Sequence, residues 1–380
     1  MANTTCLKRF VLLALSVLLF VGCSNEEPDP DPGVVNNPRY PENNDRAAEN
    51  VQFVKVAEYG LESDDDESII GQWPQVAIGP ENTVFVLDAN PGRLRAYSAD
   101  GTFLWARLQA GEGPGEISQP GNLVSDGRQY LYIHNQGGAR LDQFTMDGEL
   151  VFSIGMQDLG MSRPRLHGLL NDSTLAFSEF VRGFYGSEIR MVRMGDAWRV
   201  ASAFTIDFTD GMEVDDRLFS LLSAETLDGQ LVAPDLDEFK FRIYNESGTV
   251  TKEIIRDLEG LSAPQMIEIP SGLVQARYSS LSAPFRLDED WLIGQAKWTE
   301  NEDELVAFSR QASRENRPAA ITRSTLDFYD NDWNLIYSLN ADEQESLFQG
   351  TIMASDGHGH VFIYSRTTGT VVKYKVEVDR

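Results

Sequence analysis

The sequence has almost no cysteine. Cys6 and Cys23 are the only two among 380 residues. Cys6 lies in an N-terminal segment that we expect to be removed, so the mature chain keeps one cysteine and cannot form an internal disulfide. A cysteine nucleophile is therefore excluded, and a chain without cross-links depends on a large hydrophobic core.

Basic residues are also scarce. The chain has 32 Lys and Arg against 59 Asp and Glu, a formal net charge of −27, and lysine occurs seven times. A surface this acidic repels nucleic acid and anionic lipid. We therefore expect no nucleic-acid partner, and the charge favours cationic ones.

Long apolar runs are missing beyond the first 23 residues. The run "FVLLALSVLLFV" (10–21) is shorter than the roughly 20 residues of a membrane-spanning helix. Lys8 and Arg9 precede it, which is typical of a secretion signal over 1–22. "FVGC", ending at Cys23, resembles the lipobox of bacterial lipoproteins, which implies cleavage before Cys23 and lipidation of its sulfur. An ordinary secretion signal with a chance cysteine is the alternative.

The segment 23–50 has little to bury. It contains "SNEEPDPDPGVVNNPRYPENNDRAAEN", which is rich in Pro, Asn and acidic residues. This composition predicts a disordered acidic tether between the lipid and the folded part. Its lipid would be the only membrane contact. We expect an outer-membrane-anchored lipoprotein of the bacterial envelope, either periplasmic or surface-exposed.

What the chain does have is a repeat. Residues 74–108 and 120–155 each contain four short apolar or aromatic runs separated by Gly, Pro, Asn and Asp, the pattern of strands and turns. Asp100-Gly101 and Asp147-Gly148 are 47 positions apart. Four strands at a spacing of about 40–50 residues indicate propeller blades.

Four further units follow, at about 163–207, 219–257, 278–340 and 350–378. The last holds three strands, and "VQFVKVAEY" (51–59) resembles the fourth strand of the first unit. A ring leaves no open edge only if its last blade is complete. We therefore predict an all-β, six-bladed propeller of four-stranded blades over 51–380, with 51–59 pairing with 371–378.

The repeat length, "GEGPGE" and "VFVLDANPGRLRAYSADG" look like NHL repeats, and more narrowly like the six-bladed β-propeller lipoproteins of Bacteroidetes-type bacteria. The match is clear over 74–155 and 350–378 and loose over 163–340. Asp88, Asn90 and Arg93 match the family's "D-x-N-x-x-R" turn, and the resemblance implies that they cap the turn. The family has no settled activity, so the fold does not select a function.

The glycine cluster "GEGPGEISQP" (111–120) could suggest a phosphate-binding loop. No Lys follows the glycines, no amphipathic helix begins there, and Glu112 and Glu116 would repel an anion. We interpret the cluster as the crossing between two blades, where glycine supplies unusual backbone angles and Pro114 stiffens the bend.

The long connections should share one face of the propeller. They join second to third strands or successive blades, whereas the tight turns lie on the opposite face. Functional loops cluster at one end of a rigid scaffold, so we expect the long-connection face to be the working surface, with part of 297–323 forming a flap over the channel. The long connections are 109–119, 179–188, 207–217, 234–240 and 297–323.

Arginines and aromatic residues in or beside these connections are the candidate ligand- or partner-binding residues. Taken singly, each is more simply an ordinary loop residue that shields a blade edge. The candidates are Arg140, Arg182, Phe184, Tyr185, Phe239, Lys240, Trp298 and Arg366.

Signals for metal binding or catalysis are weak. "ESDDDES" (62–68) could bind calcium but lacks the EF-hand spacing and reads as a solvated loop. His358 and His360 could form a metal pair, yet they align with a tight turn. His134 is the best lone candidate for acid–base work, without an identifiable partner. We expect no metal site and no cofactor.

These observations predict a lipid-anchored, extracytoplasmic propeller that recognises a protein or an extracellular ligand without catalysis. The alternative is a metal-dependent hydrolase or lyase, using calcium or zinc, with three or four oxygen or nitrogen ligands converging on the central channel. A structural part of an envelope complex is a third possibility.

Overall fold

The computed structural model divides the chain into a unit over 1–31 and a unit over 32–380. All described residues lie in the second unit. The described residues are 32–37, 49–60, 66–71, 74–90, 92–108, 110–180, 186–195, 197–207, 224–235, 240–256, 265–269, 272–276, 279–298, 323–340, 350–365 and 368–379.

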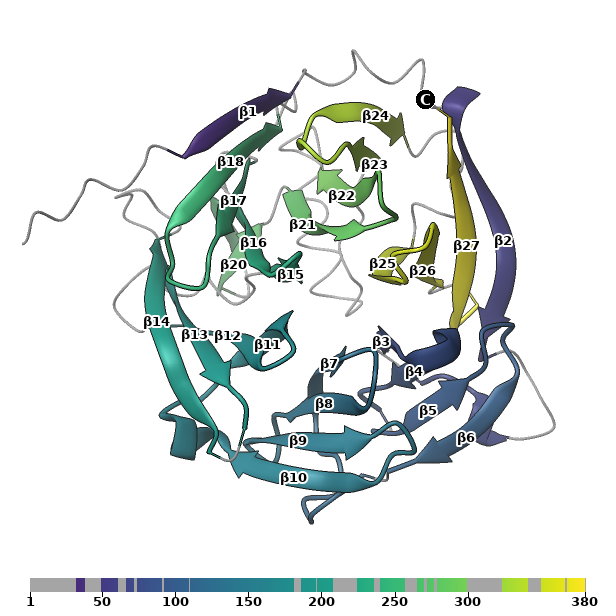
Figure 1. Ribbon diagram of the computed structural model, residues 1–380, viewed down its shortest axis with the longest axis vertical. Coiled ribbons are helices and arrows are strands. Elements are labelled where there is room, and N and C mark those ends of the chain that lie inside the picture. Colours follow the sequence, from purple (N-terminus) through teal and green to yellow (C-terminus); the bar gives the residue numbers. More distant parts are fainter. Residues whose placement is uncertain are drawn as a thin grey trace, which may run out of the picture. The chain divides into compact units, whose positions relative to one another are not determined.

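Six antiparallel four-stranded sheets are arranged in a ring, which confirms the predicted six-bladed propeller (Figure 1). Blade 1 comprises β3 (Gln75–Ile78), β4 (Val84–Leu87), β5 (Leu94–Tyr97) and β6 (Phe103–Arg107). Blade 2 comprises β7 (Pro120–Ser125), β8 (Tyr130–Asn135), β9 (Arg140–Thr145) and β10 (Leu150–Gly155). Blade 3 comprises β11 (Arg165–Asn171), β12 (Thr174–Phe180), β13 (Gly186–Arg193) and β14 (Arg199–Asp207).

The second half of the ring continues the order. Blade 4 comprises β15 (Glu225–Leu227), β16 (Gln230–Asp235), β17 (Lys240–Tyr244) and β18 (Val250–Arg256). Blade 5 comprises β21 (Ser279–Arg286), β22 (Leu292–Trp298), β23 (Arg323–Tyr329) and β24 (Leu335–Asn340). Blade 6 comprises β25 (Thr351–Ser355), β26 (His360–Ser365), β27 (Thr370–Val378) and the early strand β2 (Val51–Tyr59). A separate hairpin, β19 (Gln265–Ile269) with β20 (Gly272–Ala276), lies between blades 4 and 5 in sequence.

The two ends of the propeller meet in blade 6, as predicted. β2 runs antiparallel to β27, with Val51 opposite Val378 and Tyr59 opposite Val371. The ring of Tyr59 is fully buried, and its hydroxyl donates to the Ala99 carbonyl of blade 1 at 3.0 Å. The closing strand therefore also ties the last blade to the first.

The segment expected to be a disordered tether is partly structured. Within 23–50, residues Gly33–Asn37 form β1, a fifth strand parallel to β18 at the outer edge of blade 4. Asn37 accepts a hydrogen bond from the Leu335 amide at 2.6 Å and donates to the Trp333 carbonyl at 3.2 Å. The prediction of a wholly disordered segment is wrong for 33–37, because these residues gain a strand partner and cross-blade hydrogen bonds that composition does not reveal.

The hydrophobic core of the described chain lies between neighbouring blades. One cluster joins blades 1 and 2 through Phe85, Leu94, Leu123 and Phe144, all buried. The five other clusters each occupy another blade interface. A blade thus buries both faces of its sheet only by packing in the ring, so the repeats stabilise one another.

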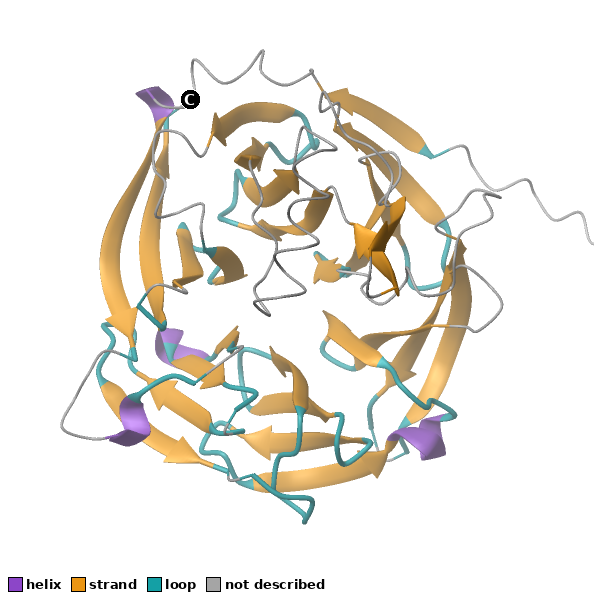
Figure 2. Ribbon diagram, turned by 180° about the vertical axis from the view of Figure 1, so that it is seen from behind, coloured by secondary structure: helices purple, strands orange, loops and turns teal. Residues whose placement is uncertain are grey.

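The connections are distributed as expected. Strand order makes every predicted long connection either a link from second to third strand or a crossing between blades. Tight turns such as those at Gly101 and Gly148, with φ of 95° and 78°, join third to fourth strands, where glycine tolerates the left-handed backbone. Helix in the described chain consists of short turns such as η1 (Asp66–Ser68) (Figure 2). Within the described ranges, no helix is long and apolar enough to span a bilayer.

Candidate functional site

The first strands of the six blades surround the central channel. Each of β3, β7, β11, β15, β21 and β25 is the terminal strand of its sheet. A terminal strand leaves one row of backbone N–H and C=O groups without a strand partner. The channel wall is therefore polar by construction, whichever side chains it carries.

A cavity of about 300 Å³ lies in this channel, and each of the six first strands lines it. Ile78, Ser125 and Ser355 are the last residues of their strands and belong to the lining, so the cavity reaches the tight-turn end of the channel. One lining residue from each strand is Gln75, Asn122, His167, Glu225, Phe285 and Ser355.

Glu225 is the ionisable carboxyl in the cavity wall. It is the first residue of β15. Burial raises the pKa of Glu225 to about 7, and attraction to the Arg165 guanidinium partly offsets that rise. A carboxyl with this pKa is about half ionised at neutral pH, which is the property expected of a ligand-binding or proton-transferring group.

Arg165 begins β11, the first strand of the blade preceding that of Glu225. Its Nε atom is buried and has no hydrogen-bond partner among the described residues. Burial lowers the pKa of Arg165, and the nearby Glu225 carboxylate partly offsets this by raising it. The guanidinium nevertheless remains cationic at neutral pH. A buried donor without an acceptor is costly, so this guanidinium is suited to an added acceptor.

His167 is a structural residue of the wall. Its Nδ1 lies 2.8 Å from the Ala224 carbonyl, and its Nε2 lies 2.7 Å from the Ser178 hydroxyl. A carbonyl can only accept, so Nδ1 carries the proton and Nε2 accepts from Ser178. Burial and the nearby Arg165 lower the pKa of His167 to about 3. The neutral ring links β11 to β12 and to the residue preceding β15, which positions Glu225.

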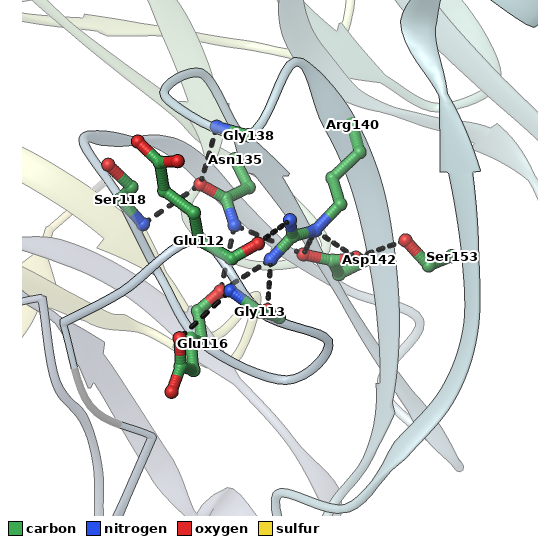
Figure 3. A network of polar contacts seen from close by, with 9 residues as sticks. All are labelled: Glu112, Gly113, Glu116, Ser118, Asn135, Gly138, Arg140, Asp142 and Ser153. Carbon is green, nitrogen blue, oxygen red and sulfur yellow. Dashed lines mark hydrogen bonds and ion pairs between the residues drawn. The ribbon is translucent and has the colours of Figure 1, made fainter.

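Arg140 does not offer a free guanidinium. Its Nε lies 2.9 Å from Asp142 Oδ2, and its terminal nitrogens donate to the carbonyls of Glu112, Gly113 and Glu116 at 2.7–2.8 Å (Figure 3). Asn135 adds a bond from Nδ2 to the Glu116 carbonyl at 2.9 Å. Arg140 therefore holds the crossing between blades 1 and 2 in one shape.

The same crossing resolves the question of the glycine cluster. The Glu116 carboxylate accepts from the Gly113 amide at 2.8 Å, and a Cβ added at Gly111 would lie 2.1 Å from Glu116 Oε2. The protein's own carboxylate thus occupies the position next to these glycines. This supports the interpretation of a blade crossing and argues against phosphate binding.

The remaining candidate residues are not brought together by the described structure. Lys240 is buried, and its Nζ lies 3.8 Å from Glu253, which also accepts from Arg242. Trp298 is placed only by its backbone, opposite Arg323. The candidates outside the described residues are Arg182, Phe184, Tyr185, Phe239 and Arg366, together with Cys23 and the predicted flap.

The structure places three of the candidate histidines, His134, His358 and His360. His134 is buried on β8, and burial lowers its pKa to about 4, so it is uncharged at neutral pH. This environment does not support acid–base work near pH 7. His358 and His360 lie in or beside the turn between β25 and β26, as expected, and His360 Nδ1 lies 2.9 Å from Asp356.

The acidic segment 62–68 is described only from residue 66, where η1 begins. The Glu67 carbonyl accepts from Arg95 Nε at 2.6 Å, and the Ser68 carbonyl from the Tyr97 hydroxyl at 2.5 Å. Within the described chain no three His, Cys, Asp or Glu side chains are grouped so that they could hold a metal ion.

Sequence reasoning missed Arg165 and Glu225. Each is a charged residue at the start of a strand, followed at once or after one residue by leucine, and this local pattern was the available signal. Nothing in the sequence states that the two strands are neighbours around one channel. Their proximity across blades 3 and 4 depends on closure of the ring.

Comparisons with known proteins support the fold. A protein from Bacteroides fragilis described as exported aligns with a TM-score of 0.58 at 10% identity, covering 91% of this chain and 100% of that one. A member of the DUF4221 family from Bacteroides vulgatus aligns with a TM-score of 0.54 at 10% identity, covering 87% and 99%. Neither a family model nor a curated protein sequence matches the chain. At such identities the likeness concerns the fold alone.

Proposed function

We propose that the protein is a lipid-anchored, extracytoplasmic recognition module that binds a protein or an extracellular ligand on its long-connection face. The observation that carries this proposal is the crossing at 110–117, where Arg140 and Asn135 hold the backbone carbonyl of Glu116. A connection fixed by a buried asparagine and a half-buried arginine presents a preformed surface, which lowers the entropic cost of binding.

The N-terminal residues support the location. The charged start, short apolar run and "FVGC" are the features of a lipidated secretion signal. The solved Bacteroides fragilis relative is described as exported, which is consistent with an extracytoplasmic, NHL-like lipoprotein of the outer membrane.

Detergent phase partitioning tests the anchor. The natural protein should enter the detergent phase, and Cys23→Ala should remain in the aqueous phase because it lacks the acylated sulfur. Cys6→Ala is the matched control, since Cys6 would leave with the signal, and it should partition like the natural protein. Equal partitioning of Cys23→Ala and the natural protein would contradict lipidation.

Capture from solubilised envelope tests recognition. Deletion of 299–320 should abolish capture of the partner while far-UV circular dichroism and thermal unfolding stay unchanged. Arg128→Ala, at an exposed turn residue on the opposite face, is the control and should capture normally. If the deletion variant captures the partner as well as the natural protein does, the partner does not bind through this part of the long-connection face.

A second candidate is the channel hydrolase or lyase. The specific observation that favours it is Glu225, whose pKa of about 7 suits a general acid or base. Elemental analysis of protein purified in calcium and in zinc, with a thermal-shift series, tests its metal-dependent form. A stoichiometric metal bound in the channel, lost on substitution of channel residues, would overturn the non-enzymatic proposal.

A further inference from the structure

The channel cavity has a wall rich in neutral hydrogen-bonding groups. Gln75 and Asn122 supply amides, and Ser125 and Thr226 supply hydroxyls, whereas the Ser355 hydroxyl already bonds to the Arg286 and His360 carbonyls. Amides and hydroxyls both donate and accept. Such a wall suits a ligand that itself carries several groups able to donate and accept.

Apolar side chains complete the lining. Phe285, Val76, Leu123 and Met353 also border the cavity. Its volume of about 300 Å³ is at the lower end of ligand pockets. A compact ring with apolar C–H faces and polar edges fits this combination better than an extended chain.

The ionisable groups around the cavity favour an uncharged ligand. β11, β16 and β21 pack against β15. From β11, Arg165 acts on Glu225, and His167 is neutral. On β21, Arg286 is paired with the exposed Asp228. Arg165 does not line the cavity, but its guanidinium acts on Glu225 and partly compensates that carboxylate, whereas an anion in the cavity would meet Glu225, so an uncharged ligand is favoured.

We propose that the channel binds a neutral polyhydroxylated ligand of monosaccharide size, with Glu225 accepting hydrogen bonds from its hydroxyls. Asn122 and Gln75 contribute further polar contacts, and Phe285 offers an apolar surface to the ring. The ligand enters from the tight-turn end, which the cavity reaches at Ile78, Ser125 and Ser355. This site is separate from the long-connection face and does not depend on it.

Binding at Glu225 should depend on pH. Hydroxyl donors favour the ionised carboxylate, so the ligand lowers the pKa of Glu225 from its free value of about 7. Affinity should then rise as pH increases from 5 to 7, by up to about tenfold per pH unit, and level off above pH 8, because the free carboxyl is already ionised there.

Titration calorimetry tests the proposal with the full mature chain and a panel of neutral aldohexoses, aldopentoses and deoxyhexoses, each at millimolar concentration. At least one sugar should bind saturably at pH 8 and at least tenfold more weakly at pH 5. Glu225→Gln should lose most of the pH dependence and at least tenfold in affinity at pH 8. Asn122→Ala should weaken binding at both pH values.

Two control variants isolate the channel site. Glu246→Gln, an exposed carboxyl in a turn of the same blade, should bind as the natural protein does. Deletion of 299–320 should leave sugar binding intact, so failure of the long-connection proposal and failure of this one are distinguishable. Unfolding curves confirm that each variant is folded.

Three results would overturn the inference. If no sugar of the panel binds saturably, a neutral polyhydroxylated ligand is excluded. If folded Glu225→Gln keeps the affinity and the pH dependence of the natural protein, Glu225 does not bind the ligand. Tighter binding of the matching uronic acids than of the neutral sugars at pH 8 would show that the site recognises an anion.

Discussion

Blades 1 and 2 place opposite charges at the same position. The 47-residue repeat aligns Asp88 with Asn135 and Arg95 with Asp142. In blade 1 the carboxylate follows the second strand and the buried cation lies on the third, where Arg95 pairs with Asp88. In blade 2 the third strand carries the carboxylate, and Asp142 pairs with Arg140.

The polar residues at these positions hydrogen-bond the backbone in both blades. Asp88 accepts from the amides of Gly71, Gly92 and Arg93 at 3.0–3.1 Å, so it caps the turn that follows β4. In blade 2 the side chain of Asn135 accepts from the Ser118 amide at 3.0 Å and donates to the Glu116 carbonyl. The fold of the blade therefore requires that the buried backbone groups at this position have hydrogen-bond partners. It does not require that the side chain supplying them be charged.

The two clusters differ in burial. The side chains of Arg95 and Asp88 are 3% and 0% exposed, whereas Arg140 is 13% exposed. Asp142 also retains a hydrogen bond from the Ser153 hydroxyl at 2.6 Å. Losing the cation should therefore cost more in blade 1 than in blade 2.

The largest effect is expected for Arg95→Ala. It leaves Asp88 buried without its cation, and breaking a buried pair from one side costs about 3–5 kcal/mol. Urea unfolding followed by tryptophan fluorescence measures the loss. A change below about 1 kcal/mol would mean that the three backbone amides alone satisfy Asp88.

Arg140→Ala should cost less, about 1–3 kcal/mol, because Asp142 keeps Ser153 and Asn135 and its cation is nearer to solvent. Its characteristic effect should be local, since the carbonyls of Glu112 and Gly113 lose this donor and the carbonyl of Glu116 keeps only Asn135. Hydrogen exchange of the amides at Gly111, Gly113 and Glu116 should accelerate, while β8 amides stay protected. Uniform acceleration throughout blade 2 would contradict a local role.

Transplanting the arrangement of blade 2 into blade 1 sharpens the comparison. Arg95→Asp alone places two carboxylates together, and adding Asp88→Asn removes that repulsion while Arg93 occupies the position that corresponds to Arg140. The double variant should be more stable than Arg95→Asp by about 1–2 kcal/mol, which is a coupling between neighbours. If the changes in unfolding free energy of the two single variants simply add in a double-mutant cycle, the polar arrangement of blade 2 cannot replace that of blade 1.

The smallest effect is expected where an ion pair lies on the surface. Arg128 and Asp172 form a pair at 2.6 Å, but their side chains are 71% and 80% exposed. Asp172→Asn should change the free energy of unfolding by less than about 0.5 kcal/mol. A loss as large as that of Arg140→Ala would show that burial does not account for the difference between the clusters.

Much of the fold follows from residues close together in sequence. The Asp-Gly turns and the alternation of apolar runs predicted six blades, because turn chemistry and the pairing of neighbouring strands are local. Closure was predictable for another reason, since the last unit lacked a fourth strand and 51–59 belonged to no unit of its own. The strand at Gly33–Asn37 was not predictable, since "GVVNN" lies in a polar, proline-rich segment and its partner β18 begins only at Val250.

The candidate site could be predicted from the sequence to a much smaller extent. The sequence places Arg140 among the candidate ligand- or partner-binding residues, and folding turns it toward backbone carbonyls that only the crossing brings together. Glu225 and Arg165 do not stand out in the sequence, because a charge at the start of a strand has no special meaning until neighbouring blades bring it beside another charge.

The sequence by itself determined the repeating sheet and the acidic, disulfide-free chain, since these depend on composition or on contacts within one repeat. It also indicated the closing strand 51–59, because the last unit lacked a fourth strand. Only the tertiary structure decided which charged side chains are satisfied and which remain available in the channel. The reason is that burial and electrostatic partners arise between blades, where residues far apart in the chain meet.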